Sequence, residues 1–173
     1  MIAIIDSGGA NIASVQFALE RLGAESVLTK DVKIIQSADK VLLPGVGAAP
    51  IAMQNLVEYG LIDCIRGLTQ PVMGICLGMQ LLFAVSPEGN TPLLGIFDAD
   101  CETFTPAQGR SVPHMGWNRL SKQQDHPLLA GVDEGAHVYF VHSYFAPVTA
   151  QTIAATNYGD DFTAIVAENN FMG

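Results

Sequence analysis

Short apolar runs alternate with amphipathic stretches along the first half of the chain. Four runs rich in β-branched and aliphatic residues predict strands buried on both faces. These runs are Ile2–Asp6, Ser26–Thr29, Lys40–Leu43 and Val72–Ile75. Apolar residues at helical spacing predict helices between and after them, at Asn11–Leu22, about Pro50–Tyr59, Leu61–Leu68 and Leu77–Val85. Strands that alternate with helices in this way predict a parallel sheet with right-handed crossovers.

The second half of the chain has short strand-like segments with few helical periods between them. They are Asp98–Phe104, Asn118–Leu120, His137–Val141, Ile153–Asn157 and Phe162–Ala167, separated by proline and glycine. We expect them to extend the first sheet rather than to form a second domain. The pattern therefore predicts one α/β domain over residues 1–173, with a three-layer, flavodoxin-like, mostly parallel sheet and an antiparallel or mixed extension in its second half.

Composition narrows the function classes. With 173 residues, 49% of them hydrophobic and only 14% charged, the chain can bury a core, and disorder is excluded. The net charge of −9 repels phosphate backbones, which argues against nucleic-acid binding. No apolar run approaches the roughly 18 residues of a membrane span. Three cysteines without paired metal spacing, and a start without a signal-like segment, predict a cytoplasmic protein with no metal site.

The strongest chemical signal is Gly74-Ile75-Cys76-Leu77-Gly78, which lies between an apolar strand and an apolar helix. A nucleophile flanked by two glycines at a strand–helix turn is the elbow of hydrolase-type sheets. The glycines permit a sharp turn, and a helix N-terminus favours thiolate over thiol. The alternative for Cys76 is a small buried hydrophobe. Cys64 and Cys101 lack this context, and we expect both to be structural.

A second loop, Pro44-Gly45-Val46-Gly47, follows another apolar strand. In a parallel sheet it lies at the carboxyl edge, where its N–H groups could supply an oxyanion donor beside the one from Leu77. An ordinary strand–helix turn is the alternative. The loop that begins at Asp6-Ser7-Gly8 lacks the pattern and the lysine of a phosphate site, so we reject a nucleotide site.

Taken together, these residues resemble the triad-type (class I) glutamine amidotransferases, most closely the glutaminase subunits of imidazole glycerol phosphate synthases. The matching motifs are Asp6…Gly8…Asn11, Pro44–Gly47, Gly74–Gln80, Pro113-His114-Met115-Gly116-Trp117-Asn118 and Phe140-Val141-His142-Ser143-Tyr144. The resemblance covers the whole chain. It departs from the family pattern in the first loop, where Ser7 and Ala10 replace an aromatic residue and a glycine.

The resemblance implies hydrolysis of the glutamine side-chain amide through a thioester on Cys76, without a cofactor. It implies an oxyanion hole from Val46 or Gly47 together with Leu77. The implied glutamine-binding residues are Gly45, Gln80, His142, Ser143 and Tyr144. It also implies a partner, a (β/α)₈-barrel cyclase that receives the ammonia, with Asn11, Met115, Trp117 and Asn118 as candidates for the docking face.

The general base is not among the matched residues. In the family, the chain continues past a segment like Asn169–Gly173 into a strand that carries the histidine and glutamate of the triad, so we expect this sequence to lack its C-terminal strand and helix. None of His114, His126, His137 and His142 lies in that motif, and the base role is transferred to none of them. Two alternatives stay open: a glutamine- or partner-binding subunit that is catalytically incomplete, and another cysteine hydrolase or chaperone-like protein on the same sheet.

Overall fold

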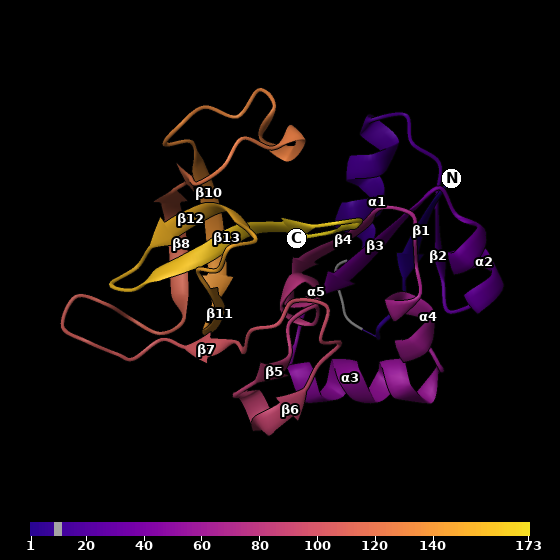
Figure 1. Cartoon of the computed structure of the whole chain (residues 1–173), viewed down its shortest axis with the longest axis horizontal. Helices are drawn as coiled ribbons and strands as arrows, with labels where there is room; N and C mark the ends of the chain where they lie inside the picture. Colours follow the sequence, from indigo (N-terminus) through magenta and orange to yellow (C-terminus); the bar gives the residue numbers. More distant parts are fainter. Residues whose placement is uncertain (9–11) are drawn as a thin grey trace.

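Five parallel strands form one half of a mixed sheet, and antiparallel strands continue it (Figure 1). The computed structural model describes residues 1–8 and 12–173. The strand order is β2-β1-β3-β4-β14-β13-β11-β7. The parallel strands are β1 (Ile2–Ile5), β2 (Ser26–Thr29), β3 (Lys40–Gly45), β4 (Val72–Cys76) and β14 (Phe171–Met172). The antiparallel part contains β7 (Glu102–Thr103), β11 (Tyr144–Pro147), β12 (Thr152–Asn157) and β13 (Asp161–Glu168), with β9 (Ser121–Lys122) paired to β12.

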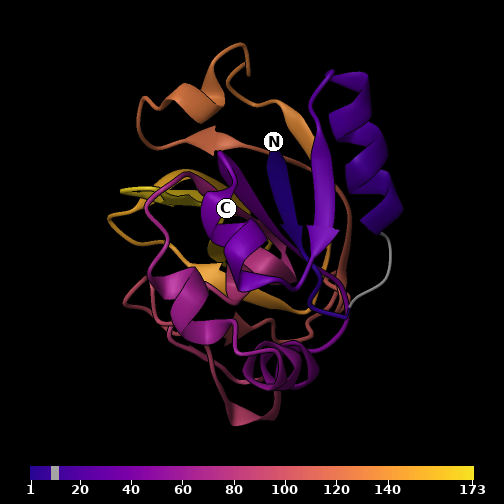
Figure 2. The same ribbon diagram turned by 90° about the vertical axis from the view of Figure 1, so that its right-hand side faces the viewer.

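Helices cover both faces of the parallel half. Figure 2 shows α1 (Ile12–Arg21) on one face of the sheet, and α2 (Val32–Ser37) and α4 (Ile62–Arg66) on the other. The remaining helical elements are α3 (Ala49–Glu58), the single turn α5 (Leu77–Gln80) and 3₁₀ turns at Glu88–Asn90 and Pro127–Leu129. The largest apolar cluster fills the space around the parallel strands, and its members from β1, β3 and β4 are almost completely buried. This burial explains why these strands are continuous apolar runs.

Two smaller strand pairs lie outside the main sheet. One pairs β5 (Val85–Ser86) with β6 (Thr91–Pro92), and the other pairs β8 (His114–Arg119) with β10 (His137–His142). The second pair stands beside β12 and β13 at the end of the molecule far from α2 (Figure 1). A separate aromatic cluster of Phe104, Phe145 and Phe162 lies there, with Phe140 and Tyr158 packed against it.

The predicted fold class is confirmed. Every strand and helix expected in the first half is present within one or two residues of its predicted ends, except the helix after Cys76, and Asn11 lies outside the described residues. The strands expected at 137–141, 153–157 and 162–167 are also present. The prediction missed the helix α2 and the strands β5, β6, β9, β11 and β14. It also began one strand too late, because β8 starts at His114 and not at Asn118.

The helix expected over Leu77–Val85 is wrong in its length, since α5 ends at Gln80. The next three residues are apolar and fully buried, as a helix would allow. However, their carbonyl groups accept hydrogen bonds from the segment 94–97: Leu94 N–H donates to Leu81, and Gly95 N–H donates to Phe83. Those carbonyls are therefore not available to a further helical turn. Likewise, only Glu102–Thr103 of the strand expected at 98–104 pairs with a neighbour.

In the ranges that the structure describes, no helix is long and apolar enough to cross a membrane.

Candidate active site

Cys76 is the last residue of β4 and the residue before α5, at the carboxyl edge of the sheet. Its backbone has φ 54° and ψ −115°, a conformation that non-glycine residues rarely adopt and that stores strain. Such outliers cluster at functional positions because the surrounding structure must hold them. The strain singles out Cys76 as the residue around which this turn is built.

Three glycines let the turn pack against the neighbouring strand. A Cβ atom on Gly78 would lie 1.8 Å from the carbonyl oxygen of Leu43, and one on Gly74 would lie 2.5 Å from that of Gly78. Gly45, which pairs with Cys76 in the sheet, would bring a Cβ atom to 2.7 Å from the Gly78 nitrogen. Each contact is with backbone, which cannot rotate away. The backbones of the two glycine motifs therefore pack in direct contact, and this contact holds Cys76 beside the Pro44–Gly47 loop.

The thiol of Cys76 does not gain acidity from this position. Partial burial raises its pKa, and a hydrogen bond from the Leu77 N–H opposes that rise only in part. The rise is opposite to the thiolate preference expected of a helix N-terminus, and the helix here, α5, is only a single turn. At neutral pH the thiol keeps its proton, and attack on a carbonyl requires a base to remove it.

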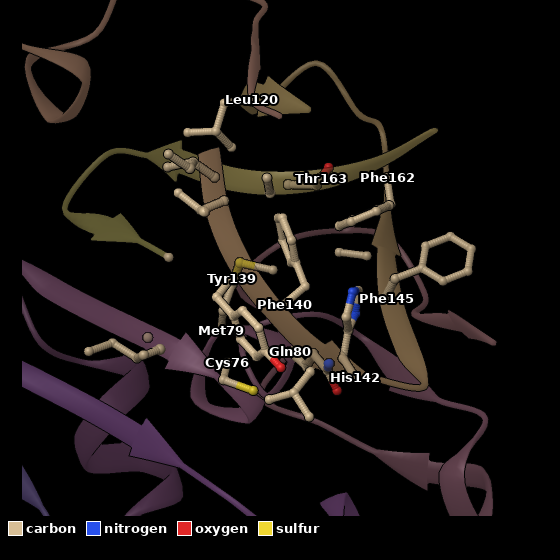
Figure 3. Close-up of a pocket in the computed structure, with 18 of the residues that line it drawn as sticks. Cys76, Met79, Gln80, Leu120, Tyr139, Phe140, His142, Phe145, Phe162 and Thr163 are labelled. Carbon is tan, nitrogen blue, oxygen red and sulfur yellow. The ribbon is translucent and has the colours of Figure 1, made fainter. Parts of the chain in front are cut away.

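A cavity of about 450 Å³ opens beside Cys76, between the end of β4 and the inner faces of β10 and β13 (Figure 3). Most of its lining is apolar. It is lined by residues 73–76, Met79, Gln80, Leu120, Leu128, residues 138–142, Phe145, Ala146, residues 162–165 and Gly173. This size is within the range of small-molecule sites. Of the predicted glutamine-binding residues, Gln80 and His142 line the cavity with Cys76, whereas Gly45, Ser143 and Tyr144 do not.

Three of the predicted substrate residues, Gln80, His142 and Tyr144, nevertheless form one network. The side chain of Gln80 is buried, and its Nε2 donates to the carbonyl oxygen of Tyr144 at 2.9 Å. His142 Nδ1 lies 2.9 Å from the same oxygen. Ser143 lies at the turn between β10 and β11, and its carbonyl accepts from Phe104 N–H at 3.1 Å. The turn that contains residues 142–144 is thus tied directly to the helix that follows Cys76.

The candidate oxyanion donors lie on both sides of Cys76. Leu77 N–H points at the thiol, as its effect on the pKa of Cys76 requires. Val46 is exposed, and Gly47 has φ 102°, which only glycine adopts without strain. Since Gly45 is paired with Cys76, the peptide groups that follow it lie next to the elbow. The predicted oxyanion donors are thus neighbours of Cys76 in the chain and in the sheet, and their role stays a prediction.

One face of the β8–β10 pair carries exposed apolar side chains. Met115 is 60% and Trp117 70% exposed, and Val141 and Tyr139, their partners across the strands, are each 55% exposed. Tyr139 and Val141 also line the cavity, so this apolar face reaches its mouth. Asn118 has the opposite orientation: it is half-buried and donates to the carbonyl of Asn157 at 2.9 Å. Asn11, the other candidate for the docking face, lies outside the described residues.

The remaining candidates are structural. Cys64 and Cys101 are buried, as expected, and burial raises the pKa of Cys101 to about 12, helped by the neighbouring carboxylates. Across residues 1–8 and 12–173, no group of three or more histidine, cysteine and acidic side chains could hold a metal ion. The sequence presents His114 only as one member of a motif and gives no sign of its own role. In the fold this histidine is buried and contacts His142.

Known proteins match nearly the whole length of the chain. The chain is 53% identical over 165 residues to the imidazole glycerol phosphate synthase subunit HisH of Xanthomonas axonopodis pv. citri, covering 95% of this chain and 82% of that protein. It is 46% identical to the HisH protein of Shewanella oneidensis, covering 99% and 86%.

Solved structures show the same fold at low identity. A crystal structure of a glutamine amidotransferase matches with a TM-score of 0.73 and 19% identity, covering 99% of this chain and 86% of that one. A glutamine amidotransferase from Thermotoga maritima matches with a TM-score of 0.69 and 15% identity, covering 99% and 73%. The family model of class-I glutamine amidotransferases matches residues 3–173. The chain therefore belongs to the class-I glutamine amidotransferase family.

Proposed function

We propose that this chain is the glutaminase subunit of an imidazole glycerol phosphate synthase, and that it supplies ammonia to a cyclase subunit in histidine biosynthesis. The observation that carries the proposal is the strained Cys76 turn at the edge of an apolar cavity, locked by glycines against the Pro44–Gly47 loop. The HisH relatives, at about half identity over nearly the whole chain, support the choice of this pathway over other amidotransferases.

The proposed reaction is covalent catalysis in two steps. The sulfur of Cys76 attacks the side-chain amide carbon of glutamine, and the thiol proton passes through a base to the amide nitrogen. Ammonia leaves, and water then hydrolyses the thioester to release glutamate and regenerate the thiol. The N–H groups of Leu77 and of Val46 or Gly47 stabilise the oxyanion in both steps. The raised pKa of Cys76 makes the base essential, because the free thiol is protonated at neutral pH.

The register of β14 supports a source for that base. This strand runs parallel to β4, with Phe171 opposite Val72 and Met172 opposite Met73. In the same register, a residue about two positions beyond Gly173 would be level with Cys76. The ring nitrogens of His142, the histidine that lines the cavity, are both within 2.9 Å of other partners. We therefore assign the base to residues that prolong β14, and the HisH relatives are longer than this chain.

The apolar face of the β8–β10 pair, formed by Met115, Trp117, Tyr139 and Val141, is the proposed docking face for the cyclase barrel. Four exposed large side chains on one pair of strands form the kind of patch that marks a protein interface. Since Tyr139 and Val141 also border the cavity, ammonia released at Cys76 would emerge under the partner. Delivery under cover matters because ammonia in bulk water is protonated and loses its nucleophilic lone pair.

The test is glutamate release from glutamine, measured with the cyclase subunit of the Xanthomonas relative. Two versions are compared: the 173-residue chain, and the same chain prolonged after Gly173 by the corresponding segment of that relative. We expect the prolonged version to turn over glutamine and the shorter one to be slower by up to about 10⁶-fold. Cys76→Ala should abolish turnover in the prolonged version, whereas the matched control Cys64→Ala should retain it. Turnover that survives Cys76→Ala would refute the proposed function.

A further inference from the structure

Two histidines form a direct hydrogen bond beside the cavity. His114 Nδ1 lies 2.9 Å from His142 Nε2, and His142 Nδ1 lies 2.9 Å from the carbonyl oxygen of Tyr144. At the other end of the chain of contacts, Asn118 Nδ2 lies 3.5 Å from His114 Nε2. The contacts join β8, β10 and β11 in one line.

The chemistry of the end groups sets the protonation of both rings. A carbonyl oxygen can only accept, so Nδ1 of His142 carries a hydrogen. With one hydrogen on a neutral ring, Nε2 of His142 is an acceptor, and Nδ1 of His114 donates to it. Nε2 of His114 is then also an acceptor and faces the amide donor of Asn118. In a neutral pair, each imidazole thus has a single tautomer.

The surroundings keep both rings uncharged. His114 is 3% exposed and stacks on Tyr158 at 3.9 Å and on Phe140 at 5.1 Å between ring centres. Burial, with a contribution from His142, lowers the pKa of His114 to about 4, and burial also lowers that of His142. The titratable neighbour is Tyr158, and among residues 1–8 and 12–173 no acidic side chain is paired with either ring.

The line of contacts ends on the helix that follows Cys76. The oxygen of Tyr144 accepts from His142 and, at 2.9 Å, from Nε2 of Gln80, which is on α5. The imidazole of His142 points toward Phe145 and Phe162 and away from Cys76 (Figure 3), with a ring-centre distance of 5.0 Å to Phe162. It therefore holds the turn in place rather than contacting the sulfur.

We propose that His114 is a positioning residue of the glutaminase site: its N–H holds His142 in one orientation and tautomer, and thereby sets the Tyr144 carbonyl and the Gln80 side chain against which glutamine binds. The proposal rests on the proposed function. A role in packing alone is the competing explanation, because His114 is surrounded by aromatic rings.

Two substitutions at this position separate the explanations. His114→Phe keeps a ring between Tyr158 and Phe140 but removes the donor, whereas His114→Asn keeps a donor near the position of Nδ1 but loses ring volume. In the chain prolonged after Gly173, with the cyclase subunit present, His114→Phe should raise the KM for glutamine about 2- to 10-fold if the hydrogen bond positions the site. This is the effect expected for the loss of one net hydrogen bond, and kcat should change less than twofold. His114→Asn should stay within about twofold of the unsubstituted protein. His137→Asn, at an exposed histidine, is the matched control.

Nuclear magnetic resonance tests the same idea without turnover. In the unsubstituted chain the proton of His142 should reside on Nδ1. In His114→Phe the side-chain amide signal of Gln80 should shift, because the Tyr144 carbonyl that accepts from Gln80 is no longer held by an oriented His142. Packing alone predicts the reverse ranking, with His114→Asn impaired and His114→Phe normal, and that result would overturn the proposal, as would an unchanged Gln80 signal in His114→Phe. If no version released glutamate, the proposed function would fail, and these resonances would still decide the role of His114.

Discussion

The fit of Gly78 against β3 leads to a quantitative prediction for Gly78→Ala. The added methyl group would lie 1.8 Å from the carbonyl oxygen of Leu43, and Cβ atoms essentially never approach another heavy atom closer than 3.0 Å. The elbow and β3 would therefore have to separate by about 1.2 Å. Both contact partners are backbone, so no rotamer change relieves the clash, and β3 is held between β1 and β4.

We expect Gly78→Ala to destabilise the fold by about 3 kcal/mol, at the upper end for overpacking. For a chain of this length that corresponds to a loss of about 6–12 °C in Tm, measured by circular dichroism. The matched control is Gly67→Ala. Gly67 also lacks a positive φ, and a Cβ atom there would lie 3.2 Å from its nearest neighbour, the Asp63 carbonyl oxygen. The change in Tm of Gly67→Ala should be less than about a third of the change in Gly78→Ala.

The same substitution should change the chemistry of Cys76. Displacement of Gly78 moves α5, and with it the Leu77 N–H that faces the thiol. The alkylation rate of Cys76 by iodoacetamide should therefore change in Gly78→Ala and stay constant in Gly67→Ala. A Gly78→Ala protein with the Tm and the alkylation rate of the unsubstituted chain would refute the claim that this glycine is required for the elbow.

Three further predictions concern single side chains. Cys76 should be alkylated before Cys64 and Cys101, at a rate that still increases at pH 9 because its pKa is raised, and peptide mapping that found either buried cysteine labelled first would contradict this. His114, with its pKa lowered to about 4, stays neutral in the fold while the unfolded chain takes up a proton near pH 6.5; stability should therefore fall by about 2 kcal/mol between pH 7 and pH 5 on its account. Urea unfolding at the two pH values should show a smaller fall for His114→Asn, and equal falls would exclude His114 as the cause. Trp117, the single tryptophan, should shift its emission to shorter wavelength when the cyclase barrel is added, and Trp117→Ala should weaken that complex about tenfold or more in a titration calorimeter.

The parallel half of the fold was predictable because its signals are local. Strands such as Ile2–Ile5 are buried on both faces and are therefore apolar throughout, and helices such as Ala49–Glu58 are apolar at helical spacing. The helix after Cys76 was predicted too long for the opposite reason. Leu81 and Phe83 suit a helix locally, but a segment more than ten residues later binds their carbonyl groups. The local periodicity of apolar residues gives no information about hydrogen bonds from a segment that lies further along the chain.

The candidate site also has one part that the sequence predicted and one part that it did not. Two glycines around a cysteine identify the elbow, because the strain at Cys76 and the close contact of Gly74 with Gly78 arise within five consecutive residues. The motif that contains His114 is visible in the sequence, but its letters do not show that alternate residues of β8 face opposite sides. The strand pairing turns Trp117 outward and His114 inward.

The sequence by itself determined the α/β class, the cysteine elbow and the two glycine loops, since each depends on residue types at short spacing. Only the tertiary structure decided that the thiol of Cys76 has a raised pKa, because that depends on how much protein surrounds the sulfur. It also decided that His114 and His142 form one neutral pair, 28 residues apart in the chain. Their hydrogen bond exists because the antiparallel register of β8 and β10 sets them opposite each other, and register is a property of two strands together.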